Sequence, residues 1–322
     1  MQLFSKSGVS AVATLPLAVR RSLVRRYLAG RRFDGDEMMT WAALNTPFYR
    51  NHYGHPIPGR LLDAPYVTAQ DIQAASPASL LSTAKRTKPA FCIENAAGAP
   101  GYFCIDDLWT MGANALCHPL SGDLAGALKR NPHCINSSSF SGSLIGPAVE
   151  RLLRGLGGCV LNLTTPDPAT IFRCLVRERP AVIVSTSDTF KDWLTILSET
   201  TKDRHNAVVQ SLQFLLHTGP DVLLSHEVRE LEQRYALRII QLFTDDYSFA
   251  FFNCTCGAIH VPLTVFVETR ATGTGQYHLV VTDLTRRTMP LVRYETGIPV
   301  SIQADSCPYL GQVTSVFPDF RY

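Results

Sequence analysis

The sequence predicts an α/β protein with a mostly parallel, helix-covered sheet and a small β subdomain at its carboxyl end. Between residues 85 and 253, short apolar runs alternate with amphipathic stretches at the spacing of strand–helix–strand units. After Asn253 the pattern changes to strand-like runs separated by Gly and Thr turns, which is typical of antiparallel strands. With 322 residues, 46% of them apolar and 18% charged, the composition excludes a disordered or fibrous chain.

These patterns divide the chain into three predicted segments. Residues 1–84 form a helical and extended segment packed on the body, residues 85–253 the α/β body, and residues 254–322 the β subdomain. The first segment begins with a basic helix rather than a signal peptide, because its apolar stretch runs into arginines and not into a cleavage site. We expect its arginines to be mostly solvated, in preference to a helix on a membrane surface: Arg20, Arg21, Arg25, Arg26, Arg31 and Arg32.

The elements of the body follow from periodicity and from helix-end signals. Acidic side chains at Asp106 and Asp107 suit a helix start, the glycines around Leu156 suit a helix end, and Ser225 suits a helix cap. The expected helices cover residues 105–116, 143–156, 167–178, 189–200 and 225–235. The expected strands cover residues 91–94, 159–163, 181–185, 212–216 and 237–242 in the body, and 261–268, 277–283 and 291–295 in the β subdomain.

Charge and cysteine content narrow the classes of partner. The formal net charge of +3 is too small to indicate a nucleic-acid surface. The sequence contains no run of 18 apolar residues, so it predicts no membrane span. Nine cysteines are too few for a disulfide scaffold in a chain of this size. We therefore expect free, mostly buried thiols in a cytoplasmic protein without nucleic-acid or membrane partners.

The stretch Leu279–Gly297, which ends in Pro-Leu-Val-Arg-Tyr-Glu-Thr-Gly, closely resembles one family. It is similar to the segment before the hinge of phenylacetate–CoA ligase-like members of the adenylate-forming superfamily. Three further regions resemble that family in order and spacing: Pro47–Arg50, Ser138–Leu163 and Leu212–Tyr247. The resemblance covers most of the chain from about residue 40 onward and implies the amino-terminal body of an adenylate-forming enzyme. In that family a carboxylate attacks the α-phosphate of ATP, and a thiol then displaces AMP.

The resemblance also implies where a nucleotide would bind, although each motif departs from the family pattern. The implied contacts are Gly98, Gly219, Asp221, Phe243, Asp245, Asp246 and Arg293. The phosphate loop around Gly98 lacks the usual hydroxyls, so a plain Gly-Pro turn is an alternative for it. Phe243 retains a flat ring for stacking. Asp245 or Asp246 would hold Mg²⁺, or would instead cap a helix as acidic turn residues.

The ribose-binding position departs from the family most clearly. Where the family has an aspartate after Gly297, this sequence has Ile298, whose side chain accepts no hydrogen bond from a ribose hydroxyl. The sequence ends at Tyr322, before a mobile domain with the family's catalytic lysine would begin, so we expect a truncated body that lacks that domain. These departures lead us to expect impaired ATP-dependent ligation.

Two functions remain open from the sequence. The resemblance implies a CoA-ligase-like, carboxylate-activating protein of a biosynthetic pathway that uses ATP and Mg²⁺ on a small carboxylic acid or acyl thioester. The alternative is a non-catalytic, ligase-derived binding partner or chaperone for an acyl carrier protein or a biosynthetic enzyme. The implied substrate pocket comprises Ser138, Ser139, Ser141 and His217, with a satisfied core histidine as an equal alternative for His217.

A set of soft ligands lies outside the nucleotide motifs. Cys254, Cys256 and His260 follow one another closely, and Cys307 lies about fifty residues further on. Three thiolates and one imidazole would complete a tetrahedral structural zinc site. Buried free thiols are the alternative, because the Cys-x-Cys spacing is tighter than that of a common zinc knuckle and the fourth ligand is remote.

Overall fold

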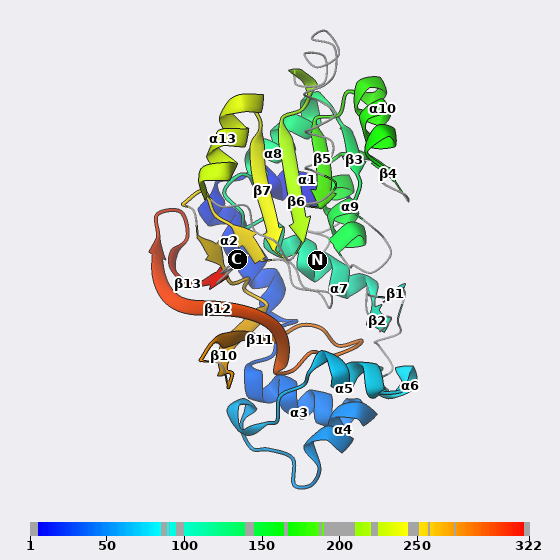
Figure 1. Cartoon of the computed structure of the whole chain (residues 1–322), viewed down its shortest axis with the longest axis vertical. Coiled ribbons are helices and arrows are strands. Elements are labelled where there is room, and N and C mark those ends of the chain that lie inside the picture. The colour runs from blue at the N-terminus through cyan, green and yellow to red at the C-terminus, as the bar shows by residue number, and fades with distance from the viewer. Residues whose placement is uncertain are drawn as a thin grey trace. The chain divides into compact units, whose positions relative to one another are not determined.

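The fold was analysed in a computed structural model of the whole chain (Figure 1). The structure describes residues 6–84, 89, 91–94, 100–138, 145–163, 167–186, 189, 210–219, 225–243, 251–256, 258–273 and 275–318. Two compact units are present: residues 1–22 with 115–257, and residues 23–114 with 258–322. Each unit combines segments that are distant in the sequence.

The first unit contains the parallel sheet that the sequence predicts. Its strands lie in the order β4-β3-β5-β6-β7-β8, and all neighbours are parallel except the last pair (Figure 1). The strands are β3 (His133–Asn136), β4 (Cys159–Asn162), β5 (Val182–Thr186), β6 (Phe214–Gly219), β7 (Arg238–Phe243) and β8 (Phe251–Asn253). The predicted strands at residues 159–163, 181–185, 212–216 and 237–242 are thereby confirmed.

Helices cover both faces of this sheet. Leu215 and Ile239 belong to a buried cluster with residues of α10 (Pro168–Glu178) and α13 (Ser225–Tyr235). The next residues along the same strands, Leu216 and Ile240, line a cavity with residues of α8 (Ser121–Arg130) and α9 (Ile145–Gly155). Successive side chains of a strand point to opposite faces, so both faces need apolar residues. This two-sided burial explains why consecutive residues of these strands are apolar, as in Val182–Val184 and Phe214–Leu216.

The end of α9 matches the glycine signal in the sequence. Gly157 has φ +98°, a left-handed conformation that suits glycine. The N–H of Gly158 donates to the carbonyl of Leu153 at 2.8 Å, and that of Gly157 donates to the carbonyl of Arg154 at 3.2 Å. These two bonds form a Schellman cap, which satisfies the last carbonyls of α9 and directs the chain into β4.

The basic helix α2 (Leu17–Ala29) confirms one part of its prediction and corrects another. Arg25 and Arg26 are exposed, as expected, but Arg20 is only 3% exposed. The Arg20 guanidinium donates to the carbonyl of Ala13, the last residue of α1 (Lys6–Ala13), at 3.2 Å and also to Ser121 Oγ. The predicted solvation is therefore wrong for Arg20, because its charge lies at the negative, carbonyl end of α1.

The second unit contains an antiparallel sheet. Its strands β10 (Val265–Ala271), β11 (Tyr277–Asp283), β12 (Tyr294–Cys307), β13 (Gly311–Pro318) and β9 (Ile259–His260) pair in that order. This confirms antiparallel strands after Asn253, and residues 277–283 match their prediction. The predicted strand at residues 291–295 is wrong in extent. β12 begins only at Tyr294, because Arg293 has φ +49° and interrupts the extended backbone.

Short helices complete the second unit, together with the hairpin β1 (Phe91–Glu94) and β2 (Pro100–Phe103). The helices are α3 (Gly35–Asn45), α4 (Pro47–Tyr53), η1 (Leu61–Asp63), α5 (Ala69–Ala74), α6 (Pro77–Leu80) and α7 (Ile105–Ala115). In α4, the buried Tyr49 hydroxyl donates to the carbonyl of Pro290 at 3.1 Å and accepts from the N–H of Val292 at 2.9 Å. Burial raises the pKa of this phenol above its ordinary value, which keeps it a donor.

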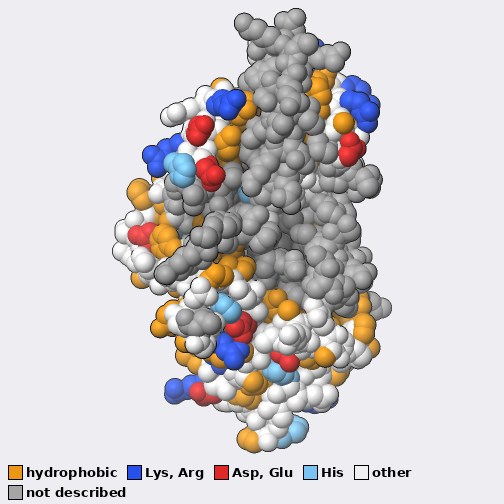
Figure 2. Space-filling model, in the orientation of Figure 1, with side chains coloured by type: hydrophobic (Ala, Val, Ile, Leu, Met, Phe, Trp, Pro, Cys, Tyr) orange, Lys and Arg blue, Asp and Glu red, His pale blue; other side chains and the backbone are white. Residues whose placement is uncertain are grey.

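Two surface properties bear on partners. No helix in the described parts of the chain is long and apolar enough to cross a membrane. On the face of the molecule shown in Figure 2, the described Lys and Arg side chains lie beside acidic side chains rather than in a continuous basic patch.

Candidate functional site

A buried polar row crosses the parallel sheet near its carboxyl edge. Ser185 of β5 lies opposite His217 of β6, which lies opposite Gln241 of β7. All three are nearly fully buried, with exposures of 0%, 1% and 5%. Because parallel strands end at one edge, the register places the three residues side by side, and ligands of open α/β sheets bind at this edge.

The phase of the strands decides the face on which this row lies. Ile183, Leu215 and Ile239 precede the three polar residues by two positions and belong to the cluster beneath α10 and α13. Side chains two positions apart share a face, so the polar row continues this apolar face toward the carboxyl edge. The row therefore places polar side chains at the carboxyl end of an apolar wall, and within it the Ser185 hydroxyl donates to the carbonyl of Thr186 at 3.1 Å.

A second polar group lies at the end of β3. The Asn136 side chain donates to the carbonyl of Gly146 at 3.2 Å and to Asn162 Oδ1 at 3.1 Å. Its own oxygen accepts from the N–H of Ser138 at 3.2 Å and from the Ser138 hydroxyl. Asn136 therefore fixes Ser138, the predicted pocket residue, by hydrogen bonds. In the sequence, Asn136 is marked only as a polar residue directly after a short apolar run, and it is not part of the family motifs.

The structure describes only part of the predicted site. Ser138 lies two residues beyond β3 and His217 lies within β6, two residues before its end; both are buried. Gly219 and Phe243 are opposite each other in the register of β6 and β7, which brings two predicted nucleotide contacts together. Phe243 is 2% exposed, and its ring centroid lies 5.9 Å from that of Phe251. The remaining predicted contacts lie outside the described residues: Gly98, Ser139, Ser141, Asp221, Asp245 and Asp246.

Arg293, the other predicted nucleotide contact, lies in the second unit and is 5% exposed. Its Nε donates to both carboxylate oxygens of Glu268 at 3.1 Å, and its Nη1 donates to the carbonyls of Leu62 and Ala64. The guanidinium also lies over the Tyr66 ring, 4.0 Å from its centroid. These contacts hold the 62–66 segment against β10 and β12, so the guanidinium is already engaged by protein groups.

The position that differs from the family's ribose aspartate lies within β12. Ile298 is half-buried, and its N–H donates to Thr296 Oγ1 at 3.2 Å. The Thr296 hydroxyl in turn donates to the carbonyl of Leu279 at 3.0 Å, which fixes this part of β12 on β11. Gly297 between them has φ +73°, a conformation that favours glycine. The side chain at position 298 is apolar and offers no acceptor.

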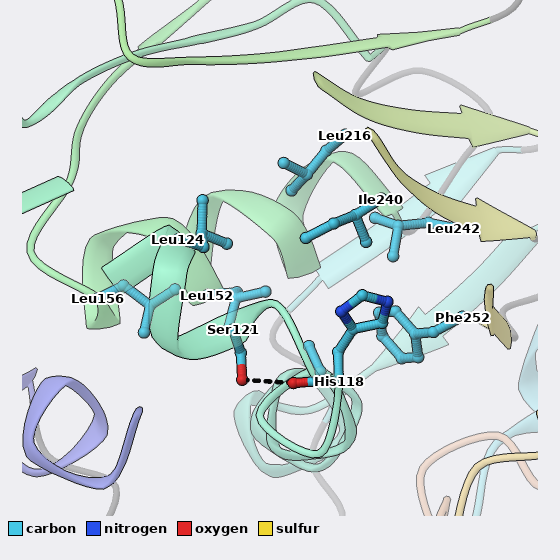
Figure 3. A pocket seen from close by; sticks show the side chains of 10 residues that line it. His118, Ser121, Leu124, Leu152, Leu156, Leu216, Ile240, Leu242 and Phe252 are labelled. Carbon is cyan, nitrogen blue, oxygen red and sulfur yellow. Dashed lines mark hydrogen bonds between the residues drawn. The ribbon is translucent and has the colours of Figure 1, made fainter. Parts of the chain in front are cut away.

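A small cavity lies on the other face of the parallel sheet (Figure 3). Its volume is about 10 Å³, which is room for about one water molecule. Leucines and Ile240 form most of its wall, and His118 and Ser121 form a polar side (Figure 3). His118 Nδ1 accepts from the N–H of Leu120 at 3.1 Å, so Nε2 carries the proton and donates to the carbonyl of Asn253. The cavity is therefore a packing feature, too small for an acyl substrate.

The four predicted metal ligands are divided between the two units: Cys254 and Cys256 belong to the first, and His260 and Cys307 to the second. Cys256 is exposed and the other three residues are buried. His260 Nδ1 is 2.9 Å from Ser315 Oγ, and this contact orients the ring. Three thiols and one imidazole are the ligand types of a tetrahedral structural Zn²⁺ site.

The architecture defines the class of fold: the chain has an α/β fold similar to that of solved CoA ligases. A 2-hydroxyisobutyryl-CoA ligase in complex with 2-HIB-AMP and CoA superposes with a TM-score of 0.67 at 15% identity, covering 98% of this chain and 73% of that chain. The same ligase in a postadenylation state, in complex with R3-HIB-AMP, gives a TM-score of 0.68, covering 98% of this chain and 71% of that chain.

A third similar structure is more distant. A benzoate CoA ligase from Burkholderia xenovorans LB400 gives a TM-score of 0.50 at 14% identity, covering 76% of this chain and 52% of that chain. No family model matches the sequence, and a search of curated proteins found no match. At identities this low, the similarity establishes the fold, and the chemistry has to be argued from the site.

Proposed function

We propose that this protein is CoA-ligase-like and binds a small acyl or aryl carboxylate, or its activated form, at the carboxyl edge of the parallel sheet. The observation that carries the proposal is the buried row Ser185, His217 and Gln241, which continues an apolar wall on a CoA-ligase fold. Polar side chains in this position would exchange their present partners for a carboxylate or carbonyl whose hydrocarbon part lies on the wall. A biosynthetic pathway that supplies and consumes acyl thioesters is the setting that this chemistry fits.

We further propose that full ATP-dependent ligation is impaired. Ile298 gives the ribose hydroxyls no acceptor, and a missing hydrogen bond to a buried hydroxyl costs about 1–3 kcal/mol. Arg293 is engaged by Glu268 and by two backbone carbonyls, which leaves its charge little capacity to attract a phosphate. Mg²⁺ and ATP would be the cofactors of the complete reaction, with the phosphates near Gly219 and the adenine ring near Phe243.

The test is to restore the missing acceptor. Ile298→Asp is expected to tighten ATP binding about 10-fold, the effect of about 1.4 kcal/mol, because the carboxylate can accept the ribose hydroxyls. Calorimetry with Mg-ATP measures affinity, and pyrophosphate release with a panel of carboxylic acids measures turnover. Ile302→Asp is the matched control, since it places the same charge four residues further along β12.

Two outcomes would count against these proposals. Tight ATP binding and rapid acid-dependent pyrophosphate release by the unaltered protein would refute the impairment. Failure of every acid to bind, with or without ATP, would refute the carboxylate site.

The second candidate function is a non-catalytic, ligase-derived binding partner or chaperone for an acyl carrier protein or a biosynthetic enzyme. The observation in its favour is the apolar side chain at the ribose position, which removes a group that only nucleotide chemistry needs. Co-purification with a carrier protein, together with no detectable ATP affinity in either Ile298 form, would favour this function over the first.

A structural zinc ion completes the proposed cofactors. Cys254, Cys256, His260 and Cys307 would hold it with all four coordination positions filled by protein. Such a closed set leaves no position for substrate, so the ion would stabilise the fold and take no part in acyl transfer.

A further inference from the structure

The charge of this chain is distributed unevenly. Residues 1–33 contain seven of the 30 Lys and Arg residues and none of the 27 Asp and Glu residues. The remainder of the sequence therefore contains more acidic than basic side chains, although the whole chain is positive. A segment with this composition attracts anionic partners, provided that its cations are exposed.

Helix α2 shows which of these cations are available. Arg20, Val24, Tyr27 and Leu28 are buried, so they form the inward side of the helix. The outward side, here called the α2 face, is formed by Val19, Ser22, Arg25 and Arg26, with Leu15 two residues before the helix. Val19, Ser22 and Arg26 are spaced at i, i+3 and i+7, which aligns them along one side of an α-helix.

The exposed cations of the α2 face are uncompensated within the described residues. No ion pair there involves Arg25 or Arg26, whereas Arg154, Arg177, Arg270 and Arg293 each pair with a glutamate. The face of the molecule in Figure 2 likewise shows basic side chains beside acidic ones. An unpaired cationic face is suited to charges supplied by a partner.

Apolar side chains in the α2 face favour a protein partner over a lipid bilayer. Leu15 is 37% exposed and Val19 is 44% exposed, so two apolar side chains adjoin the arginines. A helix that inserts into a membrane surface needs a broad apolar face, but the apolar residues of α2 are mostly turned inward. Two apolar contacts flanked by cations match a protein surface with an acidic rim and a small apolar centre.

From these observations we propose that the α2 face docks a small acidic carrier protein. The charge complementarity identifies an acidic partner, and the carrier class rests on the proposed function, since such a protein presents an acyl group or thiol on a flexible arm. Steering by the arginines would raise the association rate, and the complex would weaken with increasing salt.

The experiment measures binding of a purified acyl carrier protein, without ATP or carboxylic acid, to the full chain at low and moderate salt. Reversing both charges in Arg25→Glu/Arg26→Glu is expected to weaken binding at least 10-fold. The matched control is Arg173→Glu/Arg177→Glu on α10, which changes the net charge equally on another exposed helix and is expected to bind as the unaltered protein does.

The proposal is overturned if the unaltered chain does not bind the carrier protein, or if both double variants bind equally well. It is also overturned if Arg25→Glu/Arg26→Glu binds phosphatidylglycerol vesicles or a DNA duplex more weakly than the unaltered chain does, but binds the carrier protein with unchanged affinity. Because no nucleotide is present, failure here is distinct from failure of the proposed carboxylate activation, which is measured by pyrophosphate release.

Discussion

Arg20 illustrates how one residue can depart from the pattern of its neighbours. It belongs to a run of arginines, yet its guanidinium is buried among the carbonyls of Ala13 and Pro119 and the hydroxyl of Ser121. Burial lowers the pKa of Arg20 from its ordinary value, and the charges near it, including that of Asp123, oppose this effect. The residue remains a cation that secures the end of α1 to the start of α8.

Replacing this cation tests its structural role. Arg20→Met is expected to reduce the free energy of unfolding by about 2–3 kcal/mol, because it leaves buried acceptors without their donors. Arg25→Met, on the exposed side of the same helix, is expected to change it by less than about 0.5 kcal/mol. Urea denaturation measures both. Equal effects of the two substitutions would contradict the assigned role of Arg20.

At the residue scale, the sequence predicted the candidate site only in part. His217 and Ser138 were identified through resemblance, and both lie at the sheet edge. Asn136 and Gln241 were missed, because a polar residue beside an apolar run does not by itself show whether its side chain is buried. Their burial depends on strands that pair across long sequence separations, such as β5 with β6. Arg293 carried a family role in the motif, but its observed contacts come from the distant segment around Leu62.

At the scale of elements, burial on both faces made β5, β6 and β7 predictable, since each contains a short run of consecutive apolar residues. β3 and α8 were missed for different reasons. β3 has only four residues and includes His133 and Asn136, so its apolar run is short. α8 contains Gly122 and Gly126, which weaken a helical pattern. A Cβ at Gly122 would approach the carbonyl of Ala13 at 3.3 Å, so packing accounts for one of these glycines.

The cap of α9 yields a prediction for an element boundary. A Cβ at Gly158 would lie 2.9 Å from both the Leu153 carbonyl oxygen and Cys134 Sγ. Gly158→Ala is therefore expected to destabilise the protein by about 1–3 kcal/mol, the usual cost of overpacking. Gly30→Ala is the control, because nothing lies within 4 Å of the added carbon there. Thermal unfolding compares the two, and an unchanged melting temperature for Gly158→Ala would contradict the described packing.

At the scale of the whole molecule, each unit is assembled from sequence-distant parts. Tyr49 bonds Pro290 and Val292 within one unit, and Arg20 bonds Ser121 within the other. Such long-range contacts make folding slow and leave the units dependent on both ends of the chain. The fold class was nevertheless predictable, because the alternation of apolar and amphipathic segments indicates helices packed on a parallel sheet. The same alternation does not show which distant segments contact each other.

Metal content tests the proposed zinc ion in the whole chain. The purified protein is expected to contain about one Zn²⁺ per chain, and chelation is expected to lower its melting temperature because a closed site binds only the folded state. Cys256→Ser should reduce both the zinc content and the effect of the chelator. Cys159→Ser, which alters another exposed cysteine, should leave both unchanged. An unchanged zinc content in Cys256→Ser would exclude that thiol as a ligand.

The polar row at the sheet edge has a consequence for how this protein can change. Ser185, His217 and Gln241 share a face only because their strands keep a common phase, with Leu216 and Ile240 serving the opposite face. Inserting one residue into β6 before Leu216 would turn His217 to the opposite face of the sheet and Leu216 to the face of the polar row, because side chains alternate along a strand. The loops beyond the strands can be lengthened or replaced without this effect. Changes of specificity are therefore accessible through the loops, while the strands keep the three polar side chains on one face.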